Sequence, residues 1–156
     1  MQVFLWPIRV YYEDTDSGGV VYHSNYLKYM ERSRTEWLRA RGVEQDALLQ
    51  SQDILFAVKS LAIDFVKAAR FNQRLWVSTH LVQLRKASLE VQQAIYFADN
   101  FPLPWGRFQV LDGDELSHLK PATSCVGHVK IVCLQAQAFR PCAIPRGIME
   151  DIQREC

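Results

Sequence analysis

One stretch of the chain, residues 24–41, has the periodicity of a long helix, and several segments after it have the two-residue period of strands. This pattern predicts a single apolar helix face about five turns long. The residues on that face are Tyr26, Leu27, Met30, Ser33, Trp37 and Leu38. His23 or Ser24 is the expected N-cap and Gly42 the expected C-terminal stop. A lone helix of this kind must bury its apolar face against a sheet.

The strand pattern begins before the helix and dominates the sequence after residue 54. Residues 7–12 alternate as a short strand, and further alternating segments cover 61–66, 75–81, 89–97 and 126–134. Residues 108–111 predict a short extra strand, 85–87 a hairpin turn, and Pro145 the start of a C-terminal helix. Strands joined by short turns form antiparallel sheets. The predicted fold class is α+β, with the long helix across the concave face of a curved sheet of about five strands.

Length and charge restrict the possible partners. A chain of 156 residues predicts one domain, covering 1–156. Lys and Arg total 18 against 17 for Asp and Glu, so no overall positive field favours nucleic acid. No apolar run approaches the roughly 20 residues that span a bilayer, and the N-terminus lacks the features of a signal peptide. We expect a cytoplasmic protein with no membrane insertion, and the open sheet edges favour a homo-oligomer.

The cysteines and histidines show no spacing typical of a metal site. The four cysteines, Cys125, Cys133, Cys142 and Cys156, lie near the C-terminal end and are expected to stay reduced in the cytosol. The G-x-S-x-G, G-x-G-x-x-G, G-x-x-x-x-G-K-[ST] and H-E-x-x-H motifs are also absent from the sequence. We therefore expect neither a metal nor a cofactor.

Residues 12–26 carry the pattern that points to chemistry. An acidic, glycine-containing loop, residues 13–19, leads directly into the start of the long helix, where backbone N–H groups lack partners. Such groups can polarise a carbonyl oxygen, and the carboxylate of Asp16 could attack the carbonyl or hold the attacking water. The arrangement suits acyl transfer. From spacing alone, a surface turn for Asp16 and a helix cap for His23 are the more ordinary roles.

Residues 9–27, RVYYEDTDSGGVVYHSNYL, and 29–38, YMERSRTEWL, resemble a known family. It is that of the hot-dog-fold acyl-CoA thioesterases of the 4-hydroxybenzoyl-CoA thioesterase type, and the nearest branch is the Tol-Pal-associated acyl-CoA thioesterases. Weaker similarity extends through residues 63–75 and 84–89. The resemblance implies a hot-dog fold, in which the sheet wraps the long helix, and hydrolysis of an acyl-CoA thioester to a free acid and CoA without a metal.

The resemblance also implies roles for individual residues. Asp16 falls on the catalytic carboxylate of the family's D-x-D loop, and Asp14 on a supporting position. His23 falls on the histidine whose backbone N–H polarises the thioester carbonyl and whose imidazole assists proton transfer. The residues implied in substrate binding are Tyr22, Ser24, Asn25, Arg70, Arg85 and Lys86. The last three are candidates for the CoA phosphates, although a solvated surface role suits them equally.

The chain departs from the family pattern in two places. Ala68 and Gln73 replace residues of a characteristic turn, and residues 100–121 form a longer connection than is usual. Phe101, Trp105 and Phe108 of this connection could line or cap the acyl pocket. Several alternatives stay open: a hot-dog hydratase or dehydratase, a non-catalytic acyl-CoA-binding sensor or scaffold, acyl-carrier protein in place of CoA, Asp16 as nucleophile or general base, and a homodimer or homotetramer.

Overall fold

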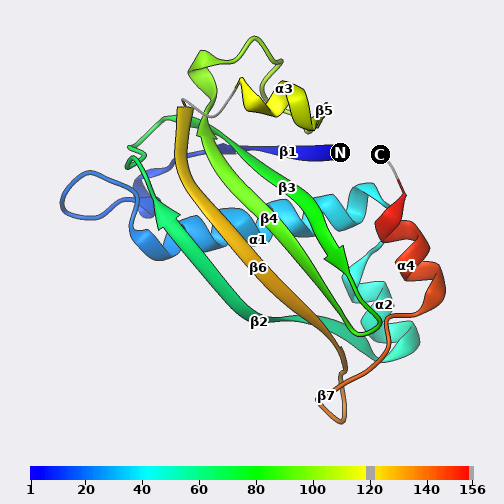
Figure 1. Ribbon diagram of the computed structural model, residues 1–156. Coiled ribbons are helices and arrows are strands. Elements are labelled where there is room, and N and C mark those ends of the chain that lie inside the picture. Colours follow the sequence, from blue (N-terminus) through cyan, green and yellow to red (C-terminus); the bar gives the residue numbers. More distant parts are fainter. Residues whose placement is uncertain (119–121, 155–156) are drawn as a thin grey trace.

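The computed structural model describes residues 1–118 and 122–154, in which one antiparallel sheet of seven strands wraps around a long helix (Figure 1). The sheet order is β2-β6-β4-β3-β1-β5, and β7 pairs with β6. The strands are β1 (Gln2–Arg9), β2 (Ile54–Phe65), β3 (Arg74–Leu84), β4 (Ser88–Phe97), β5 (Gln109–Asp112), β6 (Thr123–Gln135) and β7 (Arg140–Pro141). The helices are α1 (His23–Ala40), α2 (Gln45–Gln52), α3 (Gly113–Ser117) and α4 (Arg146–Gln153). The predicted α+β hot-dog fold is confirmed.

Helix α1 packs its predicted apolar face against the concave side of the sheet. Tyr29, Met30 and Trp37 are buried almost completely. The sheet approaches the helix closely at Gly127 of β6, where an added Cβ would lie 2.9 Å from Met30 Sδ. Leu27, predicted on the buried face, is instead 36% exposed, because it lies at the edge of the apolar stripe.

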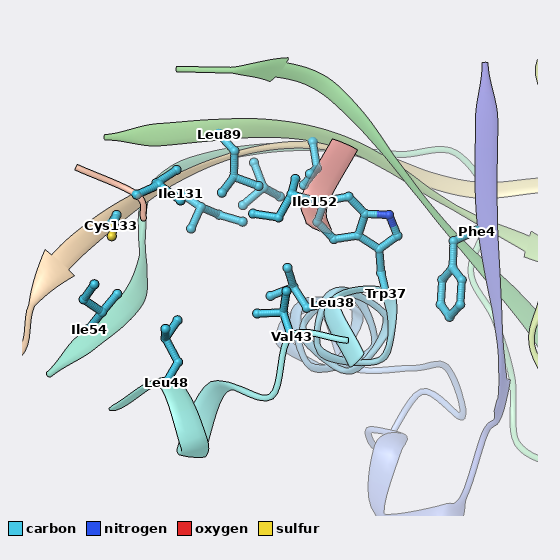
Figure 2. Packing of buried hydrophobic residues seen from close by; sticks show 13 residues of the cluster. Phe4, Trp37, Leu38, Val43, Leu48, Ile54, Leu89, Ile131, Cys133 and Ile152 are labelled. Carbon is cyan, nitrogen blue, oxygen red and sulfur yellow. The ribbon is translucent and has the colours of Figure 1, made fainter. Parts of the chain in front are cut away.

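The main core lies between α1, the sheet and the two short helices α2 and α4. Figure 2 shows Trp37 and Leu38 of α1 among side chains from α2, α4 and the strands around them. A small polar network crosses the same space: Ser33 Oγ lies 2.8 Å from Thr79 Oγ1, and Gln93 Nε2 donates to Thr79 Oγ1 at 2.7 Å. Helix α2 was not predicted, because it is short and buries only Leu48, so its sequence shows no apolar periodicity.

Two strands start earlier than predicted, and the predicted hairpin turn is confirmed. β1 covers Gln2–Arg9 rather than residues 7–12, because the apolar N-terminal residues pair with β3 and are buried. β6 begins at Thr123 rather than at residue 126. The predicted hairpin turn at 85–87 is confirmed, since the Arg85 N–H donates to the Ser88 carbonyl at 2.7 Å.

The long connection after β4 covers the outer, convex face of the sheet. Its described residues supply β5, which adds an edge strand beside β1 and confirms the predicted short strand, and then α3. Apolar side chains of the connection, Leu103 and Leu116 among them, pack against Val3, Leu5 and Trp76. Residues 119–121 of the predicted 100–121 connection lie outside the described residues. None of the helices in the described ranges is long and apolar enough to cross a lipid bilayer.

Candidate active site

The acidic loop before α1 folds into a tight hairpin. Thr15 pairs with Val21, the Asp16 N–H donates to the Val20 carbonyl at 2.9 Å, and the Gly19 N–H donates back to the Asp16 carbonyl at 3.0 Å. Gly19 has a φ of 76°, which a side chain would strain. The hairpin therefore presents Asp16 at its tip in one defined backbone conformation.

The Asp16 side chain is exposed and held by a single bond. Its Oδ1 accepts the Gly18 N–H at 2.8 Å. A Cβ on Gly18 would lie only 3.1 Å from that oxygen, so the absence of a side chain at residue 18 leaves space for the carboxylate. Oδ2 accepts no hydrogen bond from the residues that the structure describes. One carboxylate oxygen thus remains open for a water or a substrate.

Asp14, two residues earlier, faces the interior. It is 5% exposed, and its carboxylate accepts the Tyr11 N–H at 2.8 Å and Asn25 Nδ2 at 3.1 Å. Its carbonyl accepts the Tyr22 N–H at 2.9 Å. Burial first, and then the nearby Asp14 carboxylate, raise the pKa of Tyr29. Asp14 is thus the link between the loop and α1, and Asn25, implied above in substrate binding, directs its amide to Asp14.

The N-terminus of α1 lies directly after the hairpin. Tyr22 is the N-cap and its side chain makes no capping bond, so the prediction of His23 or Ser24 as the cap is wrong. Among the described residues nothing accepts the N–H groups of His23 and Ser24, the first two of the helix. Unpaired N–H groups at the positive end of a helix attract negative charge. They form a ready site for a carbonyl oxygen that gains charge.

A cavity of about 200 Å³ opens beside His23. It is mostly apolar, and its lining residues are Val21, His23, Tyr26, Phe65, Val66, Lys67 and Ala68. The Tyr26 hydroxyl accepts the Ala69 N–H at 2.9 Å, which fixes the wall of the cavity. The His23 ring is exposed and lies against the Tyr22 ring, with centroids 4.3 Å apart. Sequence reasoning missed Lys67, whose only signal was its place within the similar segment 63–75.

The predicted phosphate-binding cations lie at opposite ends of the sheet. Arg70 pairs with Val20, and its Nη1 lies 3.8 Å from where a Cβ on Gly19 would be, so it borders the hairpin. Arg85 and Lys86 follow β3, which begins beside this region at Arg74 and runs for 11 residues. At about 3.3 Å per residue, the turn after β3 is roughly 35 Å away, at the opposite end of the sheet (Figure 1).

The aromatic residues of the long connection are placed away from His23. Trp105 lies under the guanidinium groups of Arg9 and Arg74, at 4.9 and 5.9 Å from the ring centroid. Phe101 packs against Tyr96, and Phe108 stacks on Phe4. These three residues are not among the described residues that line the cavity beside His23. Within one chain, Phe101 and Trp105 pack on the outer face of the sheet, whereas Phe108 reaches Phe4 of the main core.

Comparison with known proteins places the chain in a family. Residues 18–100, more than half of the chain, match the family described as the thioesterase superfamily. The chain belongs to this superfamily. The thioesterase is 47% identical over 145 residues to the Acyl-CoA thioesterase YbgC of Haemophilus influenzae, covering 93% of this chain and 90% of the relative. It is 33% identical to the Acyl-CoA thioester hydrolase YbgC of Escherichia coli O6:H1, covering 97% of each.

Solved structures agree with the family assignment. The crystal structure of the "Probable Thioesterase" of Bartonella henselae is similar to this thioesterase with a TM-score of 0.73 and 25% identity. The alignment covers 90% of this chain and 98% of that one.

Proposed function

We propose that this thioesterase hydrolyses acyl-CoA thioesters to a free acid and CoA. The names of the two YbgC relatives support the substrate class. The observation that supports hydrolysis is that the Asp16 hairpin is joined to the start of α1, where no side chain caps the helix. The Thr15–Val21 pairing and the bond from the Tyr22 N–H to the Asp14 carbonyl make this connection. That linkage holds a carboxylate and two free N–H donors on neighbouring backbone.

The catalytic steps follow from these groups. The thioester carbonyl oxygen accepts the N–H groups of His23 and Ser24, which stabilise the negative charge that the oxygen gains, an effect of about 3 kcal/mol per donor in comparable sites. Asp16 then either attacks the carbonyl carbon, giving an anhydride that water cleaves, or removes a proton from an attacking water. In both routes the C–S bond breaks and CoA leaves. The His23 imidazole assists the proton transfer.

The remaining implied residues are assigned to substrate binding. The acyl group occupies the apolar cavity beside His23, with Tyr22 and Ser24 at its entrance. Arg70 meets the CoA phosphates, because a guanidinium next to the hairpin offers charge-assisted bonds to them. An acyl group carried by acyl-carrier protein presents the same pantetheine arm, so it is an alternative substrate. The enzyme is assigned to the cytoplasm.

We assign the active form to a homodimer or homotetramer. β2 is an edge strand of the sheet, and Val58, Leu61 and Phe65 along it are 45–55% exposed. Phe65 and the adjoining Val66, which is 66% exposed, also line the cavity beside His23. A second copy on this edge would cover the apolar side chains and bring its own Arg85 and Lys86 within reach of this site.

The experiment is thiol release from short, branched, aromatic and long acyl-CoA thioesters, with Asp16→Asn beside the unaltered protein. We expect Asp16→Asn to lose about two to four orders of magnitude in kcat with its thermal midpoint unchanged. Glu13→Gln is the matched control, because Glu13 is an exposed acid of the same loop. An Asp16→Asn enzyme as active as the control contradicts the proposal, and so does well-folded protein that binds acyl-CoA without cleaving it.

Two further measurements separate the roles. In single turnover in ¹⁸O-water, label in the Asp16 carboxylate assigns Asp16 as the nucleophile whose anhydride water cleaves at the Asp16 carbon, because a general base takes up no oxygen. His23→Ala keeps the backbone N–H and removes the imidazole. A small loss in His23→Ala assigns carbonyl polarisation to the backbone, whereas a loss as large as that of Asp16→Asn assigns an essential proton transfer to the ring.

A further inference from the structure

Two thiols lie together on the side of the core farthest from the candidate active site. Cys133 on β6 and Cys142, just after β7, have their Sγ atoms 3.6 Å apart. The Cys142 N–H donates to the Cys133 carbonyl at 3.0 Å, and the pairing of Leu134 with Pro141 places the two cysteines opposite each other. Opposed residues on antiparallel strands have Cα atoms about 4.5–5.5 Å apart, inside the range of about 4.4–6.8 Å that a disulfide spans.

The two sulfur atoms differ in access. Cys133 is fully buried at the margin of the main cluster, beside Ile131 in Figure 2. Cys142 is only partly buried. Burial, and then the neighbouring Cys142, raise the pKa of Cys133 to about 12, so Cys133 is the less reactive of the two toward a dissolved oxidant. The geometry therefore offers one accessible thiol and one concealed thiol within reach of it.

We propose that Cys133 and Cys142 are a site of reversible oxidation, where hydrogen peroxide converts the two thiols into an intrachain disulfide. The Cys142 thiolate attacks one peroxide oxygen, the O–O bond breaks, and the departing oxygen leaves as water after taking up a proton. The resulting sulfenic acid is attacked by Cys133, the S–S bond forms, the S–O bond breaks and a second water leaves. In total the thiols lose two electrons and two protons, and the peroxide is reduced to two waters.

The bridge would fasten the C-terminal arm to the sheet. After Cys142 the chain is held by the Ile144 N–H, which donates to the Lys86 carbonyl at 2.8 Å, and by α4, where Ile152 is buried in the main cluster. A covalent link at residue 142 restricts the unfolded chain and keeps this arm in place. Oxidation is thus expected to make the protein harder to unfold while leaving the distant Asp16 hairpin as it is.

The test uses the full chain with Cys156→Ser, because residue 156 lies outside the described part of the chain. Peroxide-treated and dithiothreitol-treated protein is denatured, alkylated and digested with trypsin. Lys130 and Arg146 bound a single peptide, residues 131–146, since Arg140 precedes a proline and resists cleavage. We expect this peptide to be lighter by two hydrogen atoms and unalkylated after oxidation, and to carry two alkyl groups after reduction. Cys125, fully buried on β6, should be alkylated in both samples.

The matched control is Cys142→Ser, which removes the accessible sulfur and keeps its size. We expect oxidation to raise the thermal midpoint by about 5 °C in the Cys156→Ser protein, reversibly with dithiothreitol, and to leave Cys142→Ser unchanged. A disulfide that joins two chains would overturn the proposal, and so would Cys142 oxidised to the sulfinic acid while Cys133 stays a thiol. Two free thiols in the peptide would also overturn it when oxidation of exposed methionine shows that the peroxide was active.

Discussion

Asn25 on α1 and Asp14 in the acidic loop form a buried bond, Asn25 Nδ2 to Asp14 Oδ1 at 3.1 Å, that fixes the loop on the helix. Asp14 therefore uses its carboxylate for structure, whereas Asp16, two residues later, exposes its own. The same D-x-D sequence supplies a fixed inner residue and a free outer one. The inner bond therefore ties to α1 the loop that carries Asp16.

Asn25→Ala should lower kcat about tenfold or more, because the loop loses the side-chain link that places Asp16. Leaving the buried Asp14 carboxylate short of a donor should also cost about 1–3 kcal/mol in the free energy of unfolding. Urea unfolding and thiol-release kinetics measure the two effects. Ser33→Ala is the control, since Ser33 makes buried bonds on the same helix but does not touch the loop. Equal losses of kcat in both variants would assign the effect to stability alone.

Gly18→Ala should impair catalysis with little change in stability. The new Cβ would lie 3.1 Å from Asp16 Oδ1, so the carboxylate that accepts the Gly18 N–H must shift by a few tenths of an ångström. We expect a several-fold lower kcat, a KM that is little changed, and a thermal midpoint within a few degrees of the unaltered protein. Ser17→Ala, a neighbouring exposed position, serves for comparison. Full activity in Gly18→Ala would show that this orientation of Asp16 is not the reactive one.

Much of the fold could be predicted from the sequence because its strongest patterns are local. The helical period of residues 24–41 reflects one buried face, the alternation in β3 and β4 marks them as strands although parts of both are buried on two faces, and the hairpin turn between them has a short polar signature. The predicted start of β1 was wrong because its N-terminal residues are apolar on both faces and so show no alternation. One face, with Phe4, meets the main cluster, and the other, with Val3, meets the long connection.

The site was predictable as a segment but not as a set of contacts. The order of loop and helix indicated that a carboxylate and free N–H groups lie close together, and the resemblance selected Asp16 and His23. The structural roles of Asp14 and Asn25 depend on their burial, which the neighbouring residues in the sequence do not reveal. Lys67 reaches the cavity only because the segment after β2 folds back toward α1, as the bond from the Val21 N–H to the Ala69 carbonyl shows.

His80 should make the protein less stable in mild acid. It lies on the convex face in a cavity of about 690 Å³, and burial lowers its pKa from the ordinary 6.5. As the pH falls through 6.5, His80 binds a proton in the unfolded chain but stays neutral in the folded chain. The free energy of unfolding therefore decreases. His80→Gln should flatten the fall of the thermal midpoint between pH 7 and 5, whereas His118→Gln, at an exposed histidine, should not. Parallel curves for His80→Gln and the unaltered protein would contradict this.

Arg70→Met should weaken the binding of CoA thioesters specifically. Arg70 borders the hairpin, so its loss should raise KM for acyl-CoA about tenfold through the missing charge-assisted bonds. The same acyl group on N-acetylcysteamine, which carries no phosphates, should show an unchanged KM. An equal rise for both substrates would mean that Arg70 supports the hairpin rather than the phosphates.

Arg85→Met tests whether a second copy completes the site, because the β3–β4 turn is remote from the hairpin of its own chain. We expect a raised KM for acyl-CoA in Arg85→Met alone. When Arg85→Met subunits are mixed and reassembled with inactive Asp16→Asn subunits, each hybrid holds one intact Asp16. If Arg85 serves the neighbouring subunit, that Asp16 meets an intact arginine and the KM returns to normal. A KM that stays high in the hybrid assigns any effect of Arg85 to its own chain, and an unchanged KM in Arg85→Met alone removes it from the site.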